Sequence, residues 1–129
     1  MILCHLAEAV WGPLDVTETV TQTINVVTGM DLSIDDGKKI AERIWNQIRA
    51  FAVREGYRRQ DDKLPPRFME EPIKDGPSKG MVISREMLDK MLDDYYAFRG
   101  WDKETGIPTK ERLISLGLED VAQDMEKYK

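Results

Sequence analysis

The chain is poor in the residues that most often build metal and disulfide sites, because its 129 residues include one cysteine and one histidine. A single cysteine excludes an internal disulfide framework. No apolar run approaches the roughly 18 residues that a transmembrane helix needs. The N-terminus, Met1 to His5, lacks the basic start and long apolar stretch of a signal peptide. We therefore expect a soluble, cytoplasmic protein with no membrane partner.

Excess positive charge is also missing. Charged residues make up 33% of the chain and hydrophobic residues 41%, and the formal net charge is −5. A chain with this balance has no electrostatic reason to bind nucleic acid or an anionic membrane. Its length suits one domain with a modest hydrophobic core. We predict a single helical domain over residues 1–129.

Apolar residues recur at helical spacing along most of the chain, and no segment alternates convincingly as a strand would. The strongest pattern covers residues 33–55, which Ser33 can cap. Its apolar face consists of Ile40, Ile44, Ile48 and Phe51. Further helices are expected at residues 3–11, 16–28, 84–99, 109–116 and 118–125. The many Val and Thr residues of 16–28 also suit a strand, but we favour a helix there. The predicted class is all-α, an irregular domain of five to six helices.

One long stretch, residues 57–83, contains four prolines and two glycines and shows no clear periodicity. A loop of this length is rare inside a compact domain, where most connections are a few residues long. Phe68 and Met69, in its middle, argue against disorder. We infer that the loop packs along a surface, either of this domain or of another.

Residues 43–67 hold seven basic and three acidic side chains, in contrast to the acidic chain as a whole. One interpretation is a basic patch that faces an acidic partner. Its candidate members are Arg49, Arg54, Arg58, Arg59 and Arg67. The other interpretation, which we favour, is internal pairing of Arg54, Arg58 and Arg59 with Asp61, Asp62 and the carbonyl groups at the end of the helix. The aromatic residues Trp45, Tyr95, Tyr96 and Trp101 likewise suit either a substrate channel or, more commonly, the core.

Residues 42–80 and 95–120 resemble the C-terminal helical part of the aldehyde ferredoxin oxidoreductases. The landmarks are Arg54-Glu55-Gly56, Asp61-Asp62 before Leu64-Pro65, Gly76-Pro77 and Gly80, Tyr95-Tyr96 before Arg99-Gly100-Trp101, Gly106 to Pro108, and Leu116-Gly117-Leu118. Several landmarks in the right order make the resemblance specific. It is weakest in the first 30 and the last ten residues.

The resemblance implies an enzyme with tungsten, or sometimes molybdenum, on two pterin dithiolenes and with a [4Fe–4S] cluster. Such an enzyme converts an aldehyde and water to a carboxylic acid and passes the electrons to ferredoxin. The family's last cluster cysteine follows an Asp-x-x-Gly-Leu pattern, of which only Leu3-Cys4 matches here, with Ile2 in place of the glycine. The resemblance thus makes Cys4 a candidate cluster ligand; the alternative is a buried apolar thiol. His5 is a weaker candidate for a ligand or proton carrier.

One cysteine cannot hold a cluster that needs four thiolates, and we assign no catalytic residue to this chain. The first hypothesis is therefore part of an enzyme, which is inactive alone and joined to N-terminal cofactor-binding domains in the same chain or a separate subunit. Ferredoxin is a further candidate partner, and the basic patch would meet it or the pterin phosphates. This hypothesis predicts an exposed apolar face where the cofactor domains dock. The alternative is a stand-alone helical interaction module that has lost catalysis, with a polar surface or a homodimer covering its apolar face.

Overall fold

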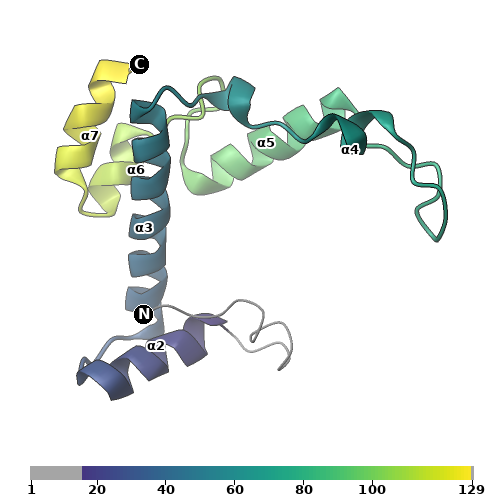
Figure 1. Ribbon diagram of the computed structural model, residues 1–129. Coiled ribbons are helices and arrows are strands. Elements are labelled where there is room, and N and C mark those ends of the chain that lie inside the picture. Colours follow the sequence, from purple (N-terminus) through teal and green to yellow (C-terminus); the bar gives the residue numbers. More distant parts are fainter. Residues whose placement is uncertain (1–15, 129) are drawn as a thin grey trace. The chain divides into compact units, whose positions relative to one another are not determined.

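The computed structural model describes residues 16–128, and helices dominate them (Figure 1). No β-strand occurs within residues 16–128, where an isolated antiparallel bridge joins Trp101 and Pro108. The all-α prediction is therefore confirmed. Backbone contacts divide the chain into two compact units, Met1–Trp45 and Asn46–Lys129. The helix predicted at residues 3–11 lies outside the described residues.

In the first unit, the Val- and Thr-rich segment forms helix α2 (Val16–Thr28), as favoured from the sequence. Two of its threonine hydroxyls donate to carbonyl oxygens four residues earlier, Thr23 to Thr19 at 2.7 Å and Thr28 to Ile24 at 2.6 Å. These bonds satisfy polar side chains inside a helix that has few other partners for them. The helix conformation thus accommodates residues whose backbone preference is for strands.

Helix α3 (Ile34–Arg54) begins in the first unit and is capped as predicted. The Ser33 hydroxyl accepts a hydrogen bond from the backbone N–H of Asp36 at 3.1 Å, and the Asp36 carboxylate accepts one from the backbone N–H of Ser33 at 2.9 Å. This reciprocal pair satisfies two of the donors left free at a helix start. The first turn of α3 lies close to α2, because a Cβ atom at Gly37 would clash with the buried Thr21 hydroxyl.

The second unit contains the end of α3 and six further helical elements. They are η1 (Arg59–Asp61), α4 (Pro66–Glu70), α5 (Arg85–Arg99), α6 (Lys110–Ser115), α7 (Glu119–Met125) and η2 (Glu126–Tyr128). Ser84 and Thr109 cap α5 and α6 by accepting hydrogen bonds from backbone N–H groups three residues later, each at 3.2 Å. Both helices begin one residue after the first residue predicted for them from the sequence.

The long Pro- and Gly-rich stretch at residues 57–83 carries more regular structure than its sequence suggested. Helix α4 begins at Pro66, where a proline costs nothing because the first N–H groups of a helix have no partner. Beyond α4 the chain turns back on itself, with Ile73 N–H donating to Met81 O at 3.1 Å and Gly80 N–H to Ile73 O at 2.8 Å. Hydrogen bonds within its own backbone therefore fix the conformation of this loop.

The hydrophobic core of the second unit lies where α6 and α7 pack against the end of α3 (Figure 1). Its buried members are Ala50, Val53, Ile107, Leu113, Leu116, Leu118, Ala122 and Met125. The helices α6 and α7 are short, so packing against α3 rather than helix propensity must stabilise them.

Candidate functional site

A buried arginine, Arg49, joins several elements of the second unit. Its guanidinium forms a bidentate ion pair with Asp62 at the end of η1, with Nη1–Oδ1 and Nη2–Oδ2 distances of 3.0 and 2.6 Å. Its Nε atom donates to the carbonyl oxygen of Gly106 at 2.8 Å. The left-handed backbone of Gly106 (φ 73°) permits this approach, because a Cβ atom there would clash with the guanidinium.

Three aromatic rings surround the same guanidinium. The Arg49 Cζ atom lies 4.9 Å from the ring centroid of Trp101, 5.4 Å from that of Tyr57 and 5.7 Å from that of Tyr96. The Tyr96 hydroxyl donates a hydrogen bond to Asp62. Burial raises the pKa of the Tyr96 phenol well above its ordinary range, and the bond to Asp62 raises it further. We call Arg49, Asp62 and Tyr96 the Arg49 cluster.

A second buried polar contact lies on the same face of α3. Asn46 is fully buried and accepts a hydrogen bond from Trp101 Nε1 at 2.9 Å. The rings of Tyr95 and Trp101 meet edge to face, with centroids 5.6 Å apart. Tyr96 and Trp101 are thus part of the packed interior, Tyr95 is half-buried, and Trp45 of the first unit is exposed.

Two members of the predicted basic patch, Arg58 and Arg59, are half-buried and bonded within the second unit. Arg59 donates to an Asp93 oxygen at 2.6 Å and to the carbonyl oxygen of Lys103 at 2.7 Å. Arg58 donates to the carbonyl oxygen of Val53 at 2.8 Å, where it satisfies a carbonyl of the last turn of α3. Internal pairing therefore engages these two arginines together with Arg49.

The remaining members of that patch, Arg54 and Arg67, are exposed. Arg54 Nε lies 3.4 Å from a Glu55 oxygen, and Arg67 Nε lies 3.5 Å from a Glu71 oxygen. Ion pairs this exposed contribute little to stability and leave the arginine free to exchange partners. A partner-facing role for the patch stays a prediction, and it now rests mainly on these two residues.

The apolar face of α3 is turned outward. In the second unit, Ile48 and Phe51 are 54% and 57% exposed, and in the first unit Ile40 and Ile44 are exposed as well. The face that packs inward carries Asn46 and Arg49 instead, together with Ala50 and Val53. Solvent-exposed apolar side chains that repeat along one helix face typically mark a surface that another polypeptide covers.

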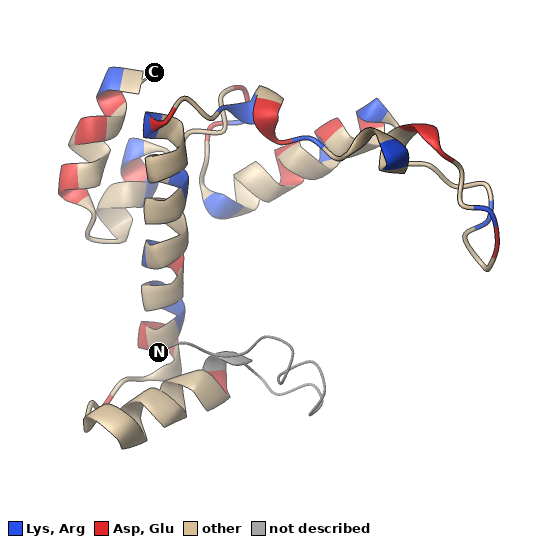
Figure 2. Ribbon diagram, in the orientation of Figure 1, with Lys and Arg blue, Asp and Glu red and all other residues tan. Residues whose placement is uncertain are grey.

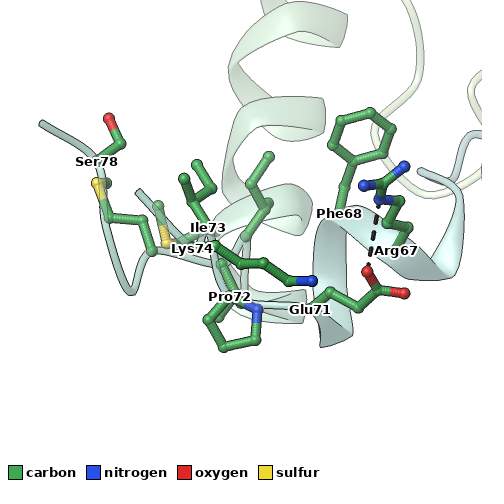
Figure 3. A pocket seen from close by; sticks show the side chains of 11 residues that line it. Arg67, Phe68, Glu71, Pro72, Ile73, Lys74 and Ser78 are labelled. Atoms are coloured by element: carbon green, nitrogen blue, oxygen red, sulfur yellow. Dashed lines mark ion pairs between the residues drawn. The ribbon is translucent and has the colours of Figure 1, made fainter. Parts of the chain in front are cut away.

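A cavity of about 580 Å³ lies between α4, the loop that follows it and the start of α5 (Figure 3). Its walls are mostly apolar and include Phe68, Pro72, Ile73, Met81, Ile83 and Met87. Charged groups of both signs stand at its edge, where Arg67 pairs with Glu71 and the Lys74 side chain extends alongside (Figure 3). The cavity therefore favours apolar groups without selecting a charge.

The candidate ligands Cys4 and His5 lie outside the described residues. Within residues 16–128, no three His, Cys, Asp or Glu side chains come together as a metal ion would require. The side chains present there do not fit a metal cofactor, and we assign none of them to one. No helix of this part of the chain has the length and apolar character needed to cross a bilayer.

Residues 1–118 match the family model described as "Aldehyde ferredoxin oxidoreductase, domains 2 & 3". The tungsten-containing aldehyde ferredoxin oxidoreductase of Pyrococcus horikoshii is 46% identical over 101 residues, which are 78% of this chain and 16% of that protein. That of Pyrococcus furiosus is 44% identical over 96 residues, 74% of this chain and 15% of that protein. A solved structure, the active-site complex BamBC of benzoyl-coenzyme A reductase with 1,5-dienoyl-CoA, matches with a TM-score of 0.69 and 31% identity. The match covers 86% of this chain and 15% of that one.

These matches define the class first: the chain is an all-α segment of a kind found within much longer enzyme chains. It belongs to the aldehyde ferredoxin oxidoreductase family. The chain spans about one sixth of the length of the curated relatives that it matches.

Sequence reasoning did not identify the Arg49 cluster. It paired Asp61 and Asp62 with arginines next to them in sequence, whereas the ion pair to Asp62 comes from the preceding helix, 13 residues earlier. A usable signal was present, because Asn46, Arg49 and Val53 form a helical face of their own at spacings of three and four. Two of these three residues are polar, and polar residues on a helix face ordinarily indicate exposure to solvent.

Proposed function

We propose that this chain is the C-terminal helical part of a tungsten-pterin aldehyde:ferredoxin oxidoreductase that acts in the cytoplasm and is inactive without the rest of the enzyme. The observation that carries the proposal is the family match over residues 1–118, combined with a span of only one sixth of the relatives' length. In this role the domain supports an enzyme whose cofactors are held mainly by other segments. The outward apolar face of α3 supports the proposal, because such a face needs a covering partner.

The cysteine content supports the inactivity of the chain alone. A [4Fe–4S] cluster requires four thiolates, and Cys4 is the single cysteine of this sequence. Cys4 would serve, at most, as one ligand of a cluster completed by three cysteines from elsewhere. When bound, the tungsten-pterin group would supply the redox chemistry that converts an aldehyde to an acid, and the cluster would pass the electrons on.

Metal analysis and a visible spectrum test this proposal. We would produce the chain alone and together with the P. furiosus enzyme truncated to lack its matching segment. The expected result is no iron or tungsten with the chain alone, and brown, tungsten-containing material that oxidises an aldehyde with the two together. Stoichiometric iron or aldehyde turnover by the chain alone would contradict the proposal. A folded chain that restores nothing would favour the stand-alone interaction module instead.

A further inference from the structure

We propose that the groove between α3 and α7 docks the remaining polypeptide of the enzyme, through an apolar side chain of that polypeptide with a basic residue beside it. This inference rests on the proposed function and names the surface and the partner chemistry. The groove has a volume of about 340 Å³ and lies wholly within the second unit. Its apolar lining consists of Ala50 and Phe51 from α3 and of Val121 and Met125 from α7.

The floor of the groove is preformed, whereas its edge is not covered. Ala50 and Met125 are members of the buried core, so they are fixed by packing before any partner arrives. Phe51 stands at the edge and is 57% exposed, with Ile48 of the same face 54% exposed. A large aromatic beside a preformed apolar pocket is the usual composition of an interface hot spot. One apolar side chain from a partner would fill the pocket and cover both residues.

The charge around the groove indicates which type of residue should stand beside the partner's inserted side chain. Helix α7 and the residue after it carry four acidic positions and no basic one, namely Glu119, Asp120, Asp124 and Glu126 (Figure 2). Asp124 is already bonded to Lys127 at 2.8 Å. Arg54 also lines the groove, where its guanidinium lies 4.8 Å from the Phe51 ring centroid and is paired with Glu55 at 3.4 Å. Asp120, by contrast, lines the groove and forms no ion pair with any basic side chain of residues 16–128. A lysine or arginine next to the inserted apolar side chain would complement this acidic edge.

The same charges argue against a second copy of this chain as the occupant. A symmetric dimer centred on the groove would bring two copies of the acidic α7 into one interface. Like charges facing one another across an interface cost free energy. The family match supplies the other candidate, since about five sixths of the relatives' length lies outside the stretch that matches this chain.

Two other apolar features of the second unit are less suited to docking. The cavity beside α4 has both Arg67 and Glu71 at its edge, paired with each other, and so selects no charge. Phe98 of α5 is 77% exposed, but it lines neither this cavity nor the groove. Phe98 therefore provides a matched control, because it is an equally large and even more exposed aromatic on a different helix.

Co-purification tests the groove. The tagged 129-residue chain would be produced with the P. furiosus enzyme truncated to lack its matching segment, and the retained polypeptide measured at several salt concentrations. We expect Phe51→Ser and Asp120→Lys each to reduce retention at least about tenfold, as removal of a hot-spot contact does. Phe98→Ser should leave retention unchanged. Retention by the unaltered chain should fall with salt, and retention by Asp120→Lys should depend on salt less. Circular dichroism melting of each variant checks that the chain still folds.

The outcomes separate this inference from the proposed function. Retention by the unaltered chain that Phe51→Ser and Asp120→Lys do not reduce would overturn the groove and leave the proposed function standing. No retention by the unaltered, folded chain would overturn both. A homodimer of the chain alone that Phe51→Ser dissociates would show that the occupant is a second copy and overturn the partner proposed here.

Discussion

At the scale of single residues, the structure shows a buried cation that is stabilised from every side. Arg49 is 7% exposed and has Asp62 as its counter-ion, the Gly106 carbonyl as an acceptor and three aromatic rings around it. A buried ion pair contributes little compared with apolar packing, but removing one partner is costly because the other charge is left buried. Loss of any single member of the Arg49 cluster should therefore lower the stability of the folded chain.

The first prediction concerns Asp62→Asn, which keeps the shape of the side chain and removes its charge. A fully buried pair broken in this way costs about 3–5 kcal/mol. Because the Asp62 side chain is 22% exposed, water can partly replace it, and we expect a loss of about 2–4 kcal/mol. Urea unfolding followed by circular dichroism measures this, with Asp75→Asn in the exposed loop as the control. A loss below about 1 kcal/mol would show that the aromatic rings alone sustain the buried charge.

The second prediction follows from the raised pKa of Tyr96. The phenol keeps its proton in the folded chain at pH values where the unfolded chain, with a pKa of about 10, has lost it. The unfolded state then binds fewer protons, so the contribution of Tyr96 to stability is intact below about pH 10 and declines as pH rises above it. Tyr96→Phe has no such group. The stability difference between the unaltered chain and Tyr96→Phe, measured by urea unfolding from pH 8 to 11.5, should therefore narrow above about pH 10. A constant difference would contradict the raised pKa.

At the scale of elements, the sequence predicted five of the six α-helices of residues 16–128 and the Ser33 cap of α3, but not the rotation of α3 about its axis. Periodicity identifies an apolar face, and in α3 that face is Ile40, Ile44, Ile48 and Phe51. Periodicity alone cannot show whether the apolar face is covered by this chain or by another polypeptide. The Asn46 and Arg49 face is buried here because long-range partners satisfy its polar groups, and those partners, up to 57 residues away, leave no local pattern. The sequence did not predict helix α4 for a local reason, because paired prolines indicate a loop as readily as the start of a helix.

The third prediction tests the close approach of α2 and α3 at Gly37. Glycine inside a helix is ordinarily less favourable than alanine by about 1 kcal/mol. Here a Cβ atom would clash with the Thr21 hydroxyl, so Gly37→Ala should destabilise the chain by about 1–3 kcal/mol despite the better helix propensity. Thermal unfolding would measure this change. In a Thr21→Ala background the clash disappears, and the same substitution should become neutral or stabilising. A loss that is equal in both backgrounds would show that the two helices do not meet at this point.

At the scale of the whole molecule, the buried residues among those that the structure describes are unevenly divided between the two units. Every described residue of the hydrophobic core lies in the second unit, whereas Thr21 is the one buried residue among residues 18–45. Few buried contacts mean a low free energy of local opening. Helix α3 crosses the boundary between the units at Trp45 and Asn46, so one helix samples both environments.

The fourth prediction uses α3 to measure that difference. Amide hydrogen exchange followed by mass spectrometry should show that protection rises at about Asn46. Residues 46–52 should be at least about tenfold more protected than residues 38–45. A difference of about 1.4 kcal/mol in the free energy of local opening is enough to give that ratio. Simple fraying of a helix predicts something different, namely protection highest in the middle and falling evenly toward both ends. A symmetric profile would therefore refute the division into units of unequal stability. If α3 is an interface within the intact enzyme, binding of the partner should raise protection most in residues 38–45, where the isolated chain has least of its own.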